Sequence, residues 1–376
     1  MFKKVLILSA SAGAGHLRAA EALKKAFINS NAAEEVRHVD TLEYTNKVFR
    51  NLYSRAYLDM VNRAPELLGW IYDHLDEPWK NERRRLALDR LNTRPFVKLL
   101  KEYQPDVTVC THFLPAEIIS WLKAKERLSV RQAIVVTDMD IHAMWLCRHY
   151  EQYFVPLDET RVHLEKLGFD PGKITVSGIP IDPIFSETKE KGEAREQLGL
   201  RKDGTVILLS AGGFGVGSVE SLLQPLLELQ HPVQIVAICG RNEELKSRLE
   251  TVAASARSNG NVEVKIMGYT TEMDVYMAAS DFLLGKPGGL TTAEALARGL
   301  ILIIVNPIPG QEERNSDHFL EEGVAIRCNN LPTLAFKIDR LLDDEIRLAA
   351  MRENVRRLAR PRAAYDVVDK LVSLKG

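Results

Sequence analysis

Two loops in the second half of the chain carry residues that suit the binding of a phosphorylated ligand. The first loop, Gly285 to Ala295, is rich in glycine and follows the apolar run Phe282 to Leu284. Glycine lets an anion approach the backbone closely, and a helix that begins here offers free N–H groups and a positive dipole end to a phosphate. The second loop, Gly310 to Asn315, follows the apolar run Leu300 to Val305. Because ligands bind at the carboxyl edge of parallel sheets, we expect both loops to face one ligand.

Glu294, in the first of these loops, has two interpretations. Thr291 and Glu294 have the spacing of a capping box, in which the glutamate carboxylate accepts a hydrogen bond from a backbone N–H at the start of a helix. Alternatively, the two carboxylate oxygens accept hydrogen bonds from the two hydroxyls of a ribose. The spacing by itself leaves both interpretations open.

A histidine near the N-terminus is a candidate general base. His16 follows the small-residue turn 9–15, which comes directly after the apolar run Val5 to Leu8. A neutral imidazole on a turn at the carboxyl end of a strand is well placed to accept a proton. The alternative is a histidine at a helix start that is held by nearby backbone.

Asp138 and Asp140 form a D-x-D sequence after the apolar run Ala133 to Val136. Such a pair can hold a divalent metal, but this pair lies in the half of the chain without the phosphate-type loops. We interpret it as a loop at a strand end and predict no metal.

Apolar runs alternate with helical patterns on both sides of Gly178 to Phe185, a stretch with two stiff prolines that we interpret as a linker. This alternation predicts an α/β fold with parallel sheets. Helices are expected at Leu17 to Phe27, Ala116 to Lys125, Ala293 to Arg298 and over much of Leu331 to Leu374. Strands are expected at Val5 to Leu8, Val107 to Cys110, Ala133 to Val136, Gln152 to Val155, Thr205 to Ser210, Val233 to Cys239, Val262 to Met267, Phe282 to Leu284 and Leu300 to Val305.

The segment 49–94 differs in character from the rest. Aromatic and aliphatic residues recur at helical spacing, among them Tyr57, Trp70 and Trp79, and a basic cluster follows that includes Arg83, Arg84 and Arg85. Rings that sit at headgroup depth and cations that attract anionic lipid are typical of a helix on a membrane surface. The alternative is a helical hairpin packed on the sheet or on a second subunit.

The overall composition is that of an ordinary globular protein. The 376 residues suffice for two domains, and 45% are hydrophobic and 27% charged. The formal net charge of −1 provides no global field toward nucleic acid or membrane. The four cysteines are scattered without a C-x-x-C pair, which favours a reducing cytosol.

Six motifs occur in order along the chain: Gly13 to His16; Thr137-Asp138 with His142 and Trp145; Gly178 to Ile181 with Pro183 and Phe185; Cys239 to Asn242; Lys286 to Glu294; and Pro309 to Glu312. In this order they resemble the diacylglycerol glycosyltransferases that use UDP-sugars, namely the processive diacylglycerol glucosyltransferases and the monogalactosyldiacylglycerol synthases. The resemblance covers almost the whole chain.

The resemblance implies a GT-B architecture, in which two Rossmann-like domains face each other across a cleft. Residues 1–178 would form the acceptor domain with its membrane-associating segment 49–94, and 179–187 the linker. Residues 188–355 would form the UDP-sugar domain, and 356–376 a C-terminal helix that packs back on the first domain. It also implies metal independence, inversion at the anomeric carbon, and peripheral attachment to the cytoplasmic face of the membrane.

The resemblance also assigns roles to individual residues. Tyr269 and its neighbours would line the uracil pocket, Arg241 would belong to the donor site, Glu294 would hold the ribose, and Gln311 and Glu312 would hold the hexose. The donor site would further include Gly213, Gly215, Lys286, Pro287, Gly288, Gly289 and Thr291. His16 would be the catalytic base, with Asp138 either orienting it or acting as the base. Gly15, His142 and Trp145 would lie on the acceptor side, and the aromatic and basic residues of 49–94 at the membrane.

The expected activity is therefore transfer of glucose from UDP-glucose to diacylglycerol, with UDP-galactose as the alternative donor. Two functions of other classes remain open, a UDP-N-acetylglucosamine epimerase and a UDP-sugar sensor without turnover. The epimerase would not need a membrane-binding segment, and the sensor would bind the donor without transfer to any lipid. The number of sugars added and the oligomeric state are not determined by the sequence.

Overall fold

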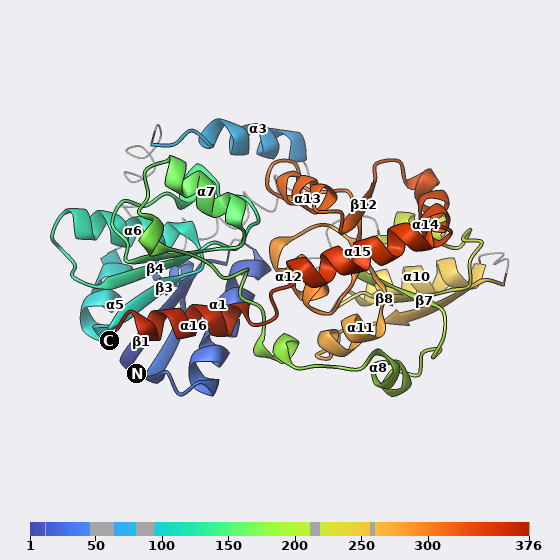
Figure 1. The fold of residues 1–376 in the computed structure, drawn as a ribbon, viewed down its shortest axis with the longest axis horizontal. Coiled ribbons are helices and arrows are strands. Elements are labelled where there is room, and N and C mark those ends of the chain that lie inside the picture. Colours follow the sequence, from blue (N-terminus) through green and yellow to red (C-terminus); the bar gives the residue numbers. More distant parts are fainter. Residues whose placement is uncertain (12, 46–63, 80–93, 211–218, 256–259, 376) are drawn as a thin grey trace.

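The chain folds into two lobes, each built on a parallel sheet of six strands (Figure 1). The computed structural model describes the chain apart from residues 12, 46–63, 80–93, 211–218, 256–259 and 376. The first sheet has the order β2-β1-β3-β4-β5-β6 and the second has the order β12-β11-β10-β7-β8-β9. This is the GT-B arrangement of two Rossmann-like domains.

The strands of the first sheet are β1 (Phe2–Ser9), β2 (Ala33–Asp40), β3 (Val107–Cys110), β4 (Arg131–Val135), β5 (Gln152–Val155) and β6 (Ile174–Val176). Those of the second are β7 (Thr205–Ser210), β8 (Val233–Ile238), β9 (Val262–Met267), β10 (Phe282–Gly285), β11 (Ile301–Val305) and β12 (Ala325–Cys328). The apolar runs predicted most of these strands because central strands of a covered parallel sheet are buried on both faces. The sequence missed β2, β6 and β12, which are all edge strands.

The helices of the first half are α1 (Ala14–Asn29), α3 (Pro65–Leu75), α5 (Arg94–Tyr103), α6 (Phe113–Ala124) and α7 (Asp158–Lys166). Those of the second half are α8 (Lys191–Gln197), α9 (Val219–Leu226), α10 (Glu243–Ser255), α11 (Met273–Ala279), α12 (Gly289–Ala297), α13 (Gln311–Glu321), α14 (Leu334–Leu342), α15 (Glu345–Leu358) and α16 (Ala363–Ser373). Short 3-10 turns lie at Thr41–Tyr44, Ala143–Trp145, Pro171–Lys173, Pro183–Ser186 and Leu331–Thr333.

The last helix returns to the first lobe. Helix α15 lies in the second lobe, and α16 lies beside β1 near both chain termini (Figure 1). Val367, Val368 and Leu371 of α16 are buried in one core with Phe2 and Phe27 of the first lobe. Helix α16 is therefore part of the first lobe's core. Burying each side chain of this size stabilises the fold by roughly 1.5–3 kcal/mol.

Each sheet has a point at which the strand order reverses, between β1 and β3 in the first and between β7 and β10 in the second. Ligands of open α/β sheets bind outside the carboxyl ends of the strands at such switch points. The loops after β1, β3 and β10 are therefore the first places to look for a site. No helix among the described residues is long and apolar enough to cross a bilayer.

Candidate active site

His16 lies at the switch point of the first sheet, in the first turn of α1. The helix begins at Ala14, earlier than the sequence predicted, and no side chain caps it. The Nδ1 atom of His16 lies 2.9 Å from the backbone oxygen of Thr111 and 2.9 Å from the Thr137 hydroxyl. Because a carbonyl can only accept a hydrogen bond, Nδ1 carries the proton of the neutral ring. The unprotonated nitrogen is then Nε2, which is the atom that a general base needs.

A second histidine, which sequence reasoning missed, packs against the first. His112 follows β3 as His16 follows β1, and the two ring centroids lie 4.6 Å apart in an edge-to-face arrangement. Its Nδ1 accepts a hydrogen bond from the N–H of Leu114 at 3.0 Å, so Nδ1 is unprotonated. Burial, together with the nearby His16, holds the pKa of His112 well below its usual value. The signal that could have found this residue is its place at the end of the strand next to β1.

Asp138 connects the first lobe to the second. It is buried, and its carboxylate accepts a hydrogen bond from the side-chain amide of Gln311 at the start of α13. Burial raises the pKa of Asp138, and the neighbouring His16 opposes that shift. Burial lowers the pKa of His16, and the Asp138 carboxylate opposes that shift in turn. The predicted base, its predicted partner and a predicted hexose-binding residue therefore meet across the two lobes.

Asn315 is a further bridging residue to which the sequence gave no role. Its side-chain oxygen accepts the N–H of Met139 at 3.0 Å, and its side-chain nitrogen donates to the backbone oxygen of Pro287 at 3.1 Å. One buried amide thus holds the loop after β4 next to the glycine-rich loop after β10.

The glycine-rich loop has the geometry of an anion-binding helix start. Helix α12 begins at Gly289 with Gly288 as its N-cap, without a side-chain cap and without an acidic residue in its first turn. A Cβ atom at Gly289 would lie only 2.4 Å from the backbone oxygen of Thr137. The start of α12 is therefore in close contact with the loop that carries Asp138, and its first N–H groups are free of a capping side chain.

The capping-box interpretation of Glu294 is wrong, because α12 begins five residues before it. Thr291 is half-buried within the helix, and Glu294 is 2% exposed. One carboxylate oxygen of Glu294 accepts a hydrogen bond from Arg18 of α1, in the other lobe. The other oxygen, Oε2, is buried and has no hydrogen-bond partner among the described residues. Burial raises the pKa of Glu294, and Arg18 opposes the shift.

Lys286, directly after β10, lies close to Glu312 in the first turn of α13. Burial lowers the pKa of Lys286, and the Glu312 carboxylate opposes the shift. Burial raises the pKa of Glu312, whose carboxylate also accepts the N–H of Ile308 at 2.7 Å. A Cβ at Gly288 would lie 3.8 Å from Glu312 Oε1, so this carboxylate is adjacent to the N-cap of α12.

Arg241 and Tyr269 form an exposed pair at the ends of β8 and β9. The Arg241 guanidinium lies 4.8 Å from the centre of the Tyr269 ring, and Tyr269 is 60% exposed. An open aromatic face with a cation beside it suits the stacking of a planar base.

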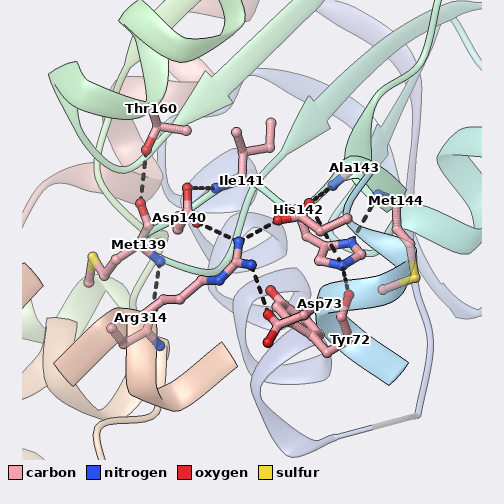
Figure 2. A network of polar contacts seen from close by, with 12 residues as sticks. Tyr72, Asp73, Met139, Asp140, Ile141, His142, Ala143, Met144, Thr160 and Arg314 are labelled. Atoms are coloured by element: carbon pink, nitrogen blue, oxygen red, sulfur yellow. Dashed lines mark hydrogen bonds and ion pairs between the residues drawn. The ribbon is translucent and has the colours of Figure 1, made fainter. Parts of the chain in front are cut away.

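The predicted acceptor residues occupy different environments. Trp145 is fully buried, with its ring centroid 6.3 Å from that of His16, and His142 is buried with its Nε2 atom 2.8 Å from the backbone oxygen of Tyr72 in α3 (Figure 2). Both side chains are therefore interior, with Trp145 near His16 and His142 bonded to α3. A Cβ at Gly15 would meet nothing within 4 Å, so this position is open.

Two of the aromatic residues that were predicted to contact the membrane, Trp70 and Trp79, are described. Trp70 on α3 is 63% exposed, whereas Trp79 is half-buried, with Arg148 3.9 Å from its ring centre. Gly213, Gly215, Tyr57, Arg83, Arg84 and Arg85 lie outside the described residues. Within the described ranges, no group of three or more His, Cys, Asp or Glu side chains could hold a metal ion.

Solved structures with similar folds include sugar-nucleotide enzymes. MurG of Acinetobacter baumannii superposes with a TM-score of 0.64 at 16% identity, covering 99% of each chain. Anabaena Alr3699/HepE in complex with UDP-glucose gives 0.56 at 13% identity, over 100% of this chain and 99% of that one. The UDP-GlcNAc 2-epimerase of Neisseria meningitidis gives 0.59 at 14% identity over the whole of both chains. At these identities the likeness establishes the fold alone.

Sequence comparison is more specific. Residues 16–181 match the model of the monogalactosyldiacylglycerol (MGDG) synthases, and residues 190–358 match that of the glycosyl transferases group 1. The processive diacylglycerol beta-glucosyltransferase of Bacillus subtilis is 28% identical over 357 residues, which cover 95% of this chain and 91% of that protein. That of Staphylococcus epidermidis is 31% identical over 338 residues, covering 85% of this chain and 80% of that protein. The chain therefore belongs to the family of the processive diacylglycerol beta-glucosyltransferases.

Proposed function

We propose that this protein transfers glucose from UDP-glucose to the hydroxyl of 1,2-diacylglycerol with inversion at the anomeric carbon. The observation that carries the proposal is the meeting of His16 and Asp138 of the first lobe with Gln311 of the second. Family membership supplies the substrate class, because relatives that match nearly the whole chain are named for diacylglycerol and glucose.

The acceptor hydroxyl is a weak nucleophile and needs a base. In the proposed step its oxygen attacks the anomeric carbon, its proton passes to Nε2 of His16, and the bond from that carbon to UDP breaks. The imidazolium that forms is stabilised by the neighbouring Asp138 carboxylate. Because attack and departure occur on opposite faces of the carbon, a single displacement inverts the configuration.

The departing UDP carries additional negative charge that must be stabilised. The uncapped start of α12 and the Lys286 side chain are available for this role, as a helix N-terminus and a cation favour an anion without a metal. We therefore propose that transfer requires no metal. Gln311 and Glu312 would hold the hexose, and Arg241 and Tyr269 the uracil.

The ribose would take Glu294 as its partner. Its buried Oε2 atom lacks a hydrogen-bond partner among the described residues, and a buried acceptor without a partner is costly. One ribose hydroxyl would satisfy Oε2, and the other would replace Arg18 on the first oxygen.

The acceptor is a lipid, and we propose that the protein works as a peripheral protein on the cytoplasmic membrane face. Helix α3 supports this proposal, because Leu67 and Trp70 are 51% and 63% exposed on it. Exposed aromatic and aliphatic side chains of this kind suit the interface of a bilayer.

The test is transfer of labelled sugar from UDP-glucose and UDP-galactose, in parallel, into diacylglycerol-containing anionic vesicles with EDTA present. We expect label in the lipid extract with UDP-glucose preferred, and labelling that is slower by about 10²–10⁴-fold with His16→Ala. Higher transfer from UDP-galactose would instead make the protein a galactosyltransferase. The match of residues 16–181 to the MGDG synthase model supports this alternative. Lipid labelling that appears only when EDTA is left out would contradict the metal-free mechanism.

Two outcomes would overturn the transferase proposal. Label that stays in water as an epimerised UDP-sugar would identify an epimerase. UDP-sugar binding that is unaffected by His16→Ala, without transfer to any lipid, would identify a sensor.

A further inference from the structure

Helix α3 belongs to the first half of the chain but packs on the second lobe (Figure 1). A Cβ at Gly69 would lie 2.7 Å from the Cβ of Pro309, and a Cβ at Gly310 would lie 2.9 Å from the ring of Tyr72. Gly310 has a φ of 87°, which favours glycine independently of this contact. The helix is therefore in direct contact with the loop that leads into α13.

One arginine of α13 gathers three carboxylates of the first half (Figure 2). The guanidinium of Arg314 lies 2.5 Å from Asp76 and 3.1 Å from Asp73, both in or next to α3. It also lies 2.9 Å from Asp140, in the loop after β4. Its charge is 5.2 Å from the centre of the Tyr72 ring. Arg314 thus joins two separate segments of the first half to the second lobe.

The same side of α13 holds the loop that carries Asp138. Gln311 donates to Asp138, and Asn315 accepts the N–H of Met139. Positions 311, 314 and 315 are neighbours on a helix surface because they are three or four residues apart. A shift of α13 relative to this loop would therefore move the carboxylate beside His16.

Helix α3 is also bonded to that loop directly. The backbone oxygen of Tyr72 accepts from His142 at 2.8 Å, and the Asp76 carboxylate accepts the N–H of Ala143 at 2.7 Å (Figure 2). Three elements, α3, α13 and the loop 138–143, consequently contact one another in pairs.

The arrangement depends on the arginine charge. Without it, the carboxylates of Asp73, Asp76 and Asp140 would face one another, and like charges at such separations repel. Lysine would be a poor substitute, because a guanidinium presents a planar set of five donors and an ammonium is a compact charge. Loss of Arg314 should therefore release α3.

We propose that Arg314 is a positioning residue. It couples the seating of helix α3, by which we mean its packing against the loop that leads into α13, to the alignment of Asp138 with the donor loops. Because α3 exposes Leu67 and Trp70, its contact with lipid and the geometry of the reaction centre are then linked through this side chain, in addition to the direct bonds from α3 to His142 and Ala143. The inference rests on the proposed transferase function for its kinetic consequence, whereas the seating of α3 can be measured without turnover.

The experiment compares Arg314→Gln with the wild-type protein in two measurements. Hydrogen–deuterium exchange of residues 65–75 should become faster in the variant, while exchange in α12 and UDP affinity stay unchanged. The kcat for transfer to diacylglycerol should fall by about 10-fold to 100-fold, the scale expected when reacting groups are displaced by about 1 Å. The matched control is Arg356→Gln, which breaks an exposed ion pair with Glu353 on α15 and should change neither measurement.

A double variant that exchanges the charges distinguishes the loss of these ion pairs from a general folding defect. Arg314→Asp combined with Asp73→Arg again places one guanidinium among three carboxylates and keeps the Asp76 bond to Ala143, so it should restore much of the protection of α3 and of kcat. Unchanged exchange in 65–75, or unchanged kcat, in Arg314→Gln would overturn the coupling. A drop in UDP affinity that matches the drop in kcat would also overturn it, since Arg314 would then act on the donor.

Absence of any glycolipid from the wild-type protein would count against the proposed function. The exchange data would still decide whether Arg314 holds α3 in place.

Discussion

The hydrogen bonds of His16 decide which of its ring nitrogens can act as a base. The Thr111 backbone oxygen fixes the proton on Nδ1 and leaves Nε2 for the substrate. His112, against its ring, is held unprotonated at Nδ1 by the N–H of Leu114. Two neutral histidines can pack together without repulsion, whereas two charged ones could not. The environment therefore favours the neutral form of His16, which a general base requires.

This environment predicts the pH dependence of transfer. Burial lowers the pKa of His16 below 6.5, so the base form persists to lower pH and the acid limb of kcat/KM should lie below pH 6.5. Asp138 raises the pKa of His16, so Asp138→Asn should move that limb further toward acid.

His16→Ala should lower kcat by about 10²–10⁴-fold, the usual contribution of a general base. Initial rates across pH would measure these effects.

The exposed His163 provides the control for this series. His163→Ala should retain both the rate and the profile. An acid limb that stays in place in Asp138→Asn would show that His16 and Asp138 do not interact in the working enzyme.

At the scale of elements, α3 is packed on one side and exposed on the other. It packs against the second lobe through Gly69 and Tyr72, and it also exposes Leu67 and Trp70. A helix of this length is marginal by itself in water, so its packed side must provide its stability. Its opposite side is then free to contact a bilayer.

The exposed side predicts how α3 contributes to vesicle binding. Trp70→Ala should reduce partition into diacylglycerol-containing anionic vesicles by about 10-fold, because inserting part of a large apolar side chain contributes on the order of 1–2 kcal/mol. UDP affinity should not change. Sedimentation with vesicles measures the partition. Phe336→Ala on α14 is a matched control, since Phe336 is also aromatic and 64% exposed. Equal partition of the two variants would remove α3 as a membrane contact.

At the scale of the whole molecule, the contacts between the lobes involve the residues of the site. Arg18 bonds Glu294, Gln311 bonds Asp138, and Gly289 lies against Thr137. Residues that are far apart in the chain thus form one reaction centre only when the lobes are together. We therefore expect transfer to depend on the spacing of the two lobes.

Gly289→Ala tests this dependence on lobe spacing. The added Cβ would lie 2.4 Å from the Thr137 oxygen, so the loops must separate. We expect kcat to fall by about 10-fold or more as the reacting groups separate, and the radius of gyration in solution scattering to rise. Alanine favours a helix over glycine by roughly 0.5–1 kcal/mol, so α12 itself should not be weakened. Gly192→Ala, where a Cβ meets nothing within 4 Å, is the control. Unchanged activity and dimensions would show that the lobes tolerate the wider spacing.

The sequence by itself determined the central strands, the glycine loops that follow them and the family. These features are encoded locally: buried parallel strands require continuous apolar runs, and close turns require glycine. The edge strands β2, β6 and β12 were missed because an edge strand has less need of apolar residues, and the apolar residues of β2 are separated by the polar pairs Glu34-Glu35 and Arg37-His38. The start of α12 was misplaced because the Thr291 and Glu294 spacing fits a cap equally well.

Only the tertiary structure decided which residues meet. Arg18 and Glu294 are 276 residues apart in the chain, and Arg314 and Asp73 are 241 apart. No local sequence pattern predicts such pairs. Each pair depends on how the two lobes pack, and the order of the strands in each sheet differs from their order in the chain. The partners of His16, the bridging role of Asn315 and the seating of α3 by Arg314 emerge for the same reason.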